Sequence, residues 1–243
     1  MRMPVDAPSG RFKTTRWTLV LRAMNLRDPL RGTALNDLCQ AYWGPLYVYL
    51  RRKGRSPEDS RDIAQGFFAY LLEKGVVEKA TRDRGRFRSF LIGVLENYLA
   101  NEHRKATALK RGGGALPFSL DFDREERLES IEPSDPSTPL SAYNRAWALA
   151  VLQRAFEAFR GESLKTQPGE HVEALLLHVQ GPADDQTHDG LAARLGRTPG
   201  EVKHLLTRSR RRLRELILEQ LRETVETESD VEAELRDLFG FLH

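Results

Sequence analysis

Six basic side chains lie within twelve residues near the C-terminal end of the chain, with no acidic residue among them: Lys203, Arg208, Arg210, Arg211, Arg212 and Arg214. On one helix, these like charges repel one another unless an anion such as phosphate lies beside them. A solvated helix face normally mixes both signs of charge, and the next acid here is Glu215. The pattern therefore favours a nucleic-acid surface over a solvated face.

The stretch His188–Glu215 has the pattern of two helices joined by a tight turn. Gly196 stands where the first helix should end, because glycine adopts a positive φ without strain. Thr198 can cap the second helix, with Pro199 in its first turn. Apolar residues at helical spacing supply the inner faces: Leu191, Ala192, Leu195, Val202, Leu205, Leu206, Leu213 and Leu216. This spacing predicts a helix-turn-helix, whose second helix enters the DNA major groove.

Composition limits the remaining choices. The 243 residues allow one large or two ordinary domains, and 40% apolar with 30% charged residues is typical of a soluble, helix-rich chain. We find neither an apolar run of about 18 residues, as a membrane span needs, nor a signal peptide. The single cysteine, Cys39, excludes an internal disulfide or a cysteine-based zinc site, and its apolar neighbours predict a buried thiol. We expect a cytoplasmic protein without membrane insertion.

Charge is unevenly distributed although the net value is only +3. Basic clusters lie at Arg82–Arg88, His103–Arg111 and Lys203–Arg214, and acidic ones at Asp121–Asp135 and Glu219–Asp237. This segregation predicts basic faces for nucleic acid, and acidic segments that stay away from nucleic acid or imitate it.

Helical periodicity runs through most of the chain and predicts an all-α fold. We expect helices from Thr14 to Met24, from Gly32 to Lys53, from Ser56 to Gly75 and from Phe87 to Lys110, and helical periodicity resumes at Leu140 and at His171. Pro45 should kink the second of these helices or divide it in two, and Gly54 should end it.

Two small helical domains, 14–111 and 140–218, are expected on this basis, the second containing the helix-turn-helix. An acidic, Pro- and Ser-containing linker, 112–139, joins them. Residues 1–13 form an expected flexible tail, and residues 219–243 an acidic, amphipathic C-terminal extension.

Two stretches of the first domain carry a family resemblance. The run Asp62-Ile63-Ala64-Gln65-Gly66-Phe67-Phe68 resembles the D-[LI]-x-Q-x-x-F helix of bacterial sigma factors. Phe87-Arg88-Ser89-Phe90-Leu91, followed by Asn97, Asn101 and Arg104-Lys105, resembles the next helix of that family. With the helix-turn-helix in the same order, the chain resembles RNA polymerase sigma factors of the extracytoplasmic-function (ECF) class, in the sigma-70-like family. The resemblance covers Thr14–Arg111 as sigma region 2 and Leu140–Leu218 as sigma region 4.

In region 2, the resemblance implies that Arg61, Asp62 and Gln65 contact a coiled coil of the RNA polymerase β′ subunit, the alternative being an ordinary solvent-facing helix. It also implies a reader of the promoter −10 element. Opening DNA without ATP needs cations for the backbone, a stacking surface or pocket, and amides for base edges. The matching residues are Arg84, Arg86, Phe87, Arg88, Asn97, Asn101, Arg104 and Lys105. A core position is the alternative for Phe87, and plain solvent positions are the alternative for the two asparagines.

In region 4, the resemblance implies that the −35 duplex faces Lys203, His204, Thr207, Arg208 and Arg211. Arg210, Arg212 and Arg214 would contact phosphates or the polymerase β flap. Many family members carry Ser-Arg where this chain has His204-Leu205, so the −35 sequence is expected to differ. The acidic linker is either a segment threaded through the RNA exit path or a flexible tether.

Enzymatic function is not expected. The six histidines show no metal-ligand spacing, and Gly112–Gly114 lacks the Lys-Ser/Thr of a phosphate-binding loop. We expect no cofactor and no metal.

The leading hypothesis is an ECF-type sigma factor whose partners are core RNA polymerase, promoter DNA and an anti-sigma factor or other regulator. The alternative is a stand-alone dimeric helix-turn-helix regulator. For residues 219–243, we expect packing on the chain or on a partner, with an effect on access to the basic surfaces.

Overall fold

The computed structural model describes residues 18–25, 27–73, 86–108, 138–181, 188–225 and 227–242. Every regular element within these ranges is a helix, which confirms the predicted all-α class. The predicted tail, most of the predicted linker and Arg84 lie outside the described residues. None of the described helices is both long and apolar enough to cross a membrane.

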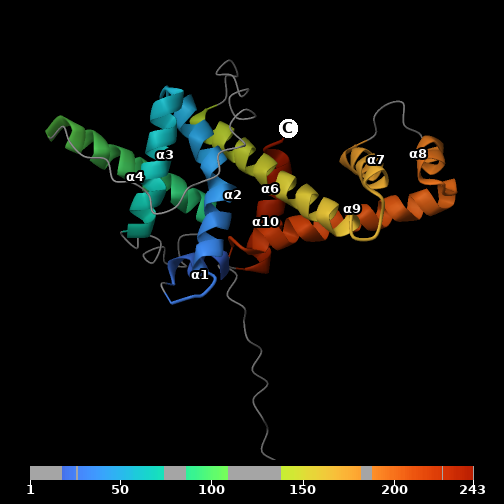
Figure 1. Cartoon of the computed structure of the whole chain (residues 1–243). Helices are drawn as coiled ribbons and strands as arrows, with labels where there is room; N and C mark the ends of the chain where they lie inside the picture. The colour runs from blue at the N-terminus through green and yellow to red at the C-terminus, as the bar shows by residue number, and fades with distance from the viewer. Residues whose placement is uncertain are drawn as a thin grey trace, which may run out of the picture.

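Helix α2 (Arg31–Arg52) lies at the centre of the molecule, between α3 and α6 (Figure 1). Its residues from Ala41 to Leu50 are almost all buried, because α1 (Thr18–Met24), α3 (Pro57–Glu73) and α6 (Pro139–Ser163) pack around it. The helix continues through Pro45, so the predicted division does not occur. One missing N–H does not break a helix that is held by packing on several sides.

The junction between α2 and α3 follows the local sequence. Gly54 has φ +83° and directly follows the last turn of α2, as predicted. The Ser56 hydroxyl then accepts a hydrogen bond from the Asp59 N–H at 3.0 Å, which caps α3.

Helix α4 (Phe87–Ala108) lies close to α3 at one glycine. A Cβ added to Gly66 would lie 2.7 Å from the Tyr98 hydroxyl oxygen of α4. The Phe67 and Tyr98 rings also contact each other, with 5.7 Å between centroids. The close approach of α3 and α4 therefore explains why a glycine stands at position 66, within the Asp62–Phe68 run.

The second half of the chain is built along α9 (Pro199–Arg222), whose C-terminal half packs against α6 and α10 (Glu228–Gly240). Helices α7 (Gly169–Gln180) and α8 (His188–Leu195) lie at the other end of α9, away from α3 and α4 (Figure 1). The predicted extension thus begins inside α9 and contains one further helix.

Helices of the two predicted domains touch directly and share one hydrophobic core. Tyr49 of α2 meets Tyr143 of α6 edge to face, with 6.2 Å between ring centroids. Val48 packs with Ala142 and Ala146 in a neighbouring buried cluster. Cys39 is buried as predicted, and burial raises the pKa of its thiol to about 12.

Candidate nucleic-acid interfaces

The turn between α8 and α9 has the residues that its geometry needs. Gly196 adopts φ +61°, which favours glycine. The Arg197 N–H donates to the Ala192 carbonyl oxygen at 2.9 Å and closes the end of α8. Both helices and the turn lie where the sequence predicts them.

Thr198 and Glu201 fix the first turn of α9 by a reciprocal capping box. The Glu201 N–H donates to the Thr198 hydroxyl at 3.3 Å, and the Thr198 N–H donates to the Glu201 carboxylate at 2.8 Å. The hydrogen bonds from Thr198, its backbone N–H first, lower the pKa of Glu201. Thr198 is the predicted cap, whereas its partner Glu201 was missed, although a Glu three residues after a Thr is the standard signal.

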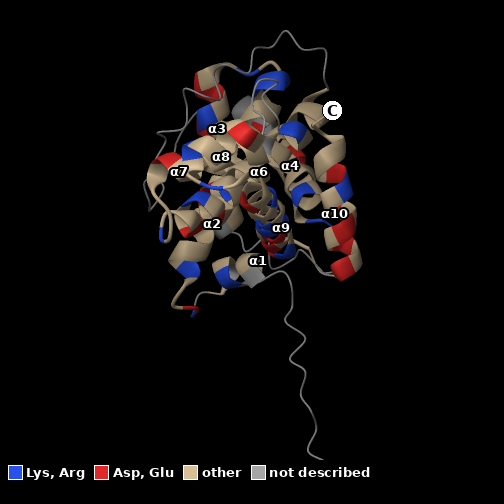
Figure 2. Ribbon diagram, turned by 90° about the vertical axis from the view of Figure 1, so that its right-hand side faces the viewer, with Lys and Arg blue, Asp and Glu red and all other residues tan. Residues whose placement is uncertain are grey.

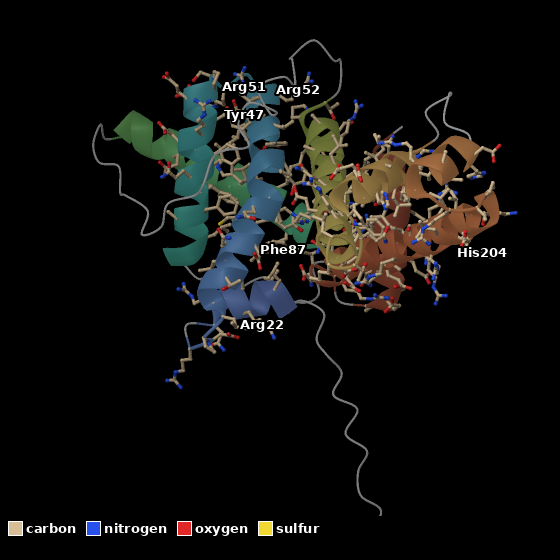
Figure 3. The ribbon with its side chains drawn as sticks, turned by 45° about the vertical axis from the view of Figure 1, so that its right-hand side comes forward. Arg22, Tyr47, Arg51, Arg52, Phe87 and His204 are labelled. Carbon is tan, nitrogen blue, oxygen red and sulfur yellow. The ribbon has the colours of Figure 1, made fainter. Side chains whose placement is uncertain are left out.

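The five residues predicted for the −35 duplex share one exposed face of α9: Lys203, His204, Thr207, Arg208 and Arg211. At 3.6 residues per turn they occupy an arc of about 140°. This arc lies opposite the buried residues Val202, Leu205, Leu206, Ser209 and Leu213. His204 lies at the outer end of α9, away from Phe87 in the interior (Figure 3).

The arginines of α9 have different surroundings. Arg212 donates to Glu162 of α6 at 2.7 Å and to Glu219 at 3.1 Å, so it ties α9 to α6. Its hydrogen bond is also the main cause of a lowered pKa for Glu162. Arg210 donates to the His178 carbonyl oxygen of α7 at 3.5 Å. Arg212 is therefore half-buried and held by neighbouring acids, whereas Arg210 stays exposed beside α7.

The other cations between Lys203 and Arg214 are open to solvent. Arg211 is 83% exposed and has an ion pair with Glu215 at 3.3 Å. Lys203, Arg208 and Arg214 are exposed, and no carboxylate of the described residues pairs with them. These four side chains are available to phosphate or base edges.

Among the described residues, those predicted for the −10 element do not form one surface. Asn97 and Asn101 are exposed and share a face of α4, one turn apart. Nine residues separate Arg88 from Asn97, which places them on opposite sides of the helix. Arg104 and Lys105 belong to α4, but their side chains are not among those described.

Phe87 is a core residue, only 2% exposed, with its ring 5.3 Å from that of Tyr42 in an edge-to-face contact. The alternative of a core position therefore holds for Phe87, and it offers no stacking surface in this conformation.

Arg88 is 6% exposed and is surrounded by α6 and α10. Its guanidinium lies 2.9 Å from Glu234 and 3.0 Å from Asp237, both on α10, and donates to Asn144 at 2.6 Å. The Trp147 and Phe241 rings lie on it, at 4.9 and 5.0 Å. In this conformation Arg88 is not available to DNA, contrary to its predicted exposure. The sequence pointed to no partner for it.

Arg86, which precedes α4, joins the same cluster. Its guanidinium pairs with Asp237 and lies 3.6 Å from Glu234. Burial raises the pKa of Glu234, and the nearby Arg88 and Arg86 oppose that shift. Arg86, Arg88, Glu234 and Asp237 are called the arginine–acid cluster below.

Arg61, Asp62 and Gln65 lie on the side of α3 opposite its buried residues Ala64 and Phe67. Asp62 is exposed, and the other two are half-buried. This position suits a docking face and equally an ordinary solvent face, so polymerase contact stays a prediction.

No family model matches the chain. Neither the curated proteins nor the solved structures contain a match. Among the described residues, no group of three or more His, Cys, Asp or Glu side chains could hold a metal ion.

Proposed function

We propose that this chain is a sigma factor of the ECF type, which binds core RNA polymerase, recognises −35 and −10 promoter elements and promotes DNA melting. The observation that carries the proposal is the exposed basic face of α9, placed directly behind a capped first turn and opposite the buried face. A helix of this kind, following a short helix and a glycine turn, suits insertion into a major groove.

Duplex recognition is assigned to this face. Arg208 and Arg211 can each donate two hydrogen bonds to a guanine edge, and Lys203 can bind phosphate. The Thr207 hydroxyl donates to the Lys203 carbonyl oxygen at 2.9 Å, so toward DNA it acts as an acceptor. Arg212 and Arg210 support the reading face from behind by holding α9 to α6 and α7.

Recognition of unpaired DNA is assigned to α4. The exposed amides of Asn97 and Asn101 can read a base edge, which an open strand presents and a duplex hides. The outer face of α3, with Arg61, Asp62 and Gln65, is assigned to the β′ subunit. The polymerase supplies the catalytic step, and a cytoplasmic location follows from that partner.

The proposal is tested by reconstituted transcription with core polymerase and promoter fragments from the source genome. Arg208→Ala and Asn97→Ala should each reduce run-off product by about tenfold or more, because each removes a base or phosphate contact worth about 1–3 kcal/mol. Both variants should still co-elute with core polymerase on gel filtration. Arg236→Ala, an exposed arginine on α10 outside the proposed surfaces, is the matched control and should change neither measurement.

Two outcomes contradict the proposal. Absence of any complex with core polymerase, together with tight duplex binding by a dimer, supports the stand-alone regulator. Loss of core binding in Arg208→Ala or Asn97→Ala shows that the faces are assigned to the wrong partners.

A further inference from the structure

Two acids of α10 face the start of α4. Glu234 and Asp237 are three residues apart, so they share one side of the helix and both reach Arg86 and Arg88. Glu232, on the other side, is exposed. Figure 2 shows that acidic residues recur along α10. The arginine–acid cluster thus joins residues that are about 150 positions apart in the chain.

The contact chemistry resembles that of arginine with a nucleic-acid backbone. Guanidinium groups bind carboxylate and phosphate oxygens with the same donor geometry. Glu234 and Asp237 occupy the donors that two phosphates would need, and Phe241 covers one face of the Arg88 guanidinium. Phosphate and α10 are therefore competitors for the same two arginines.

Helix α10 is attached differently on its two sides. Val231 and Leu238 are fully buried, and the helix packs on α9 and α6. Its hydrogen bonds to Arg86 and Arg88 are ionic. The buried Arg88–Glu234 pair is shielded from salt, whereas Arg86 and Asp237 are partly exposed, and a polyanion can compete for them.

We propose that α10 is a displaceable cover over a nucleic-acid surface. In the free chain, Glu234 and Asp237 hold Arg86 and Arg88, and the backbone of single-stranded DNA takes their place on binding. This inference rests on the proposed function, because it assigns the two arginines to the unpaired strand. By linkage, whatever weakens the cover strengthens DNA binding.

The test measures anisotropy of a labelled 20-nucleotide single-stranded DNA of mixed sequence with the full chain at several salt concentrations. The double variant Glu234→Gln/Asp237→Asn should bind about tenfold more tightly, the scale of one charge-assisted contact. Its plot of log affinity against log salt should also be steeper, because the natural chain exposes two carboxylates that take up cations when DNA binds, and this uptake offsets part of the counterion release from the DNA.

The matched control is Glu228→Gln/Glu232→Gln, which removes two charges from the same helix, and the Arg222–Glu228 ion pair with them, but leaves the arginine–acid cluster intact. Its affinity for the DNA probe should stay within about twofold of that of the natural chain, because screening limits the effect of charges that do not contact Arg86 or Arg88. An equal gain in both double variants, or no gain in a folded Glu234→Gln/Asp237→Asn, overturns the inference.

A second measurement needs no substitution. Hydrogen exchange of the natural chain should show that α10 loses protection when the DNA probe is saturating, while α2 stays protected. Unchanged or increased protection of α10 overturns the inference even when the double variant does not fold.

Transcription separates this inference from the function on which it rests. If the double variant gains DNA affinity but no form of the chain directs core polymerase, the cover is real and the sigma function fails. If the natural chain directs transcription and the double variant gains neither affinity nor salt dependence, the function stands and the cover fails.

Discussion

Gly196 and Thr198 determine where the proposed reading face of α9 begins. Gly196 provides a left-handed backbone conformation, and Thr198 with Glu201 holds the first turn. Neither residue needs to touch DNA. Their effect is on the position of Lys203 and His204, which lie within the next two turns.

Replacing Gly196 by Ala should reduce the free energy of unfolding by about 1–2 kcal/mol, because a Cβ disfavours positive φ. Asn, which tolerates this conformation better, should cost less than Ala. Chemical denaturation of the two variants measures the difference. Equal stability of Ala and Asn at this position would contradict the assigned backbone conformation.

Glu234 gives a pH dependence of stability with an unusual sign. Burial raises the pKa of its carboxyl above the ordinary 4.5, so the folded chain binds this proton more tightly than the unfolded chain does. The contribution of Glu234 to stability therefore grows as pH falls from the raised pKa toward 4.5. Glu234→Gln should remove this slope. Denaturation of the natural chain and of Glu234→Gln across that pH range measures the slope. A difference between their free energies of unfolding that is constant with pH would falsify the assignment.

Helix α9 carries two kinds of arginine, those open to solvent and those that hold it to neighbouring helices. Its outer face carries open cations, whereas Arg212 is committed to Glu162 and Glu219. A count of charges in the sequence cannot separate these roles, because the separation depends on which helix packs behind the arginine.

A matched pair of variants tests that separation. Lys203→Ala should reduce the slope of log affinity against log salt by about 0.9 on duplex DNA, the contribution of one phosphate contact. Arg212→Ala should leave the slope unchanged and instead lower thermal stability, since it removes ion pairs between α6 and α9. Anisotropy titrations and thermal melts give both readouts, and a reduced slope for Arg212→Ala would place it on the DNA side.

The helices themselves are largely predictable because their signals are local. Gly54, Gly196, Thr198 and the apolar periods lie within a few residues of the structure that they determine. The arginine–acid cluster is not predictable in this way. Arg88 and Glu234 are 146 residues apart, and the sequence shows one as a basic and the other as an acidic residue without showing that they meet. Phe87 likewise resembles a stacking residue until Tyr42 is placed beside it.

The two proposed reading faces, on α4 and α9, belong to one packed molecule in which α2 and α6 touch directly. Promoter elements about 25 base pairs apart lie about 85 Å apart at 3.4 Å per base pair. In the proposed function, we expect the contact between α2 and α6 to open when both elements are bound.

Energy transfer between dyes on Arg55→Cys and Ser141→Cys should report this opening. Both positions are exposed and border the contact in which Val48 meets Ala142. Cys39 should remain unlabelled, since it is buried and the raised pKa keeps its thiol protonated. Transfer should fall when core polymerase and promoter are added together and stay constant with a −35 duplex alone. Constant transfer in an actively transcribing complex contradicts the opening.

Helix α9 is one uninterrupted helix of 24 residues, with an exposed first turn and with Leu216, Ile217 and Leu221 buried toward its end. A continuous helix is stiff over this length, so a rotation imposed at Lys203 is transmitted to Leu221, about 27 Å away. Leu221 is fully buried, in the half of α9 that packs against α6 and α10. Docking of the outer end of α9 on a duplex would therefore apply torque to the half of α9 against which α10 packs. The stiff helix would in this way couple the two proposed reading surfaces, on α9 and α4, without any contact between them.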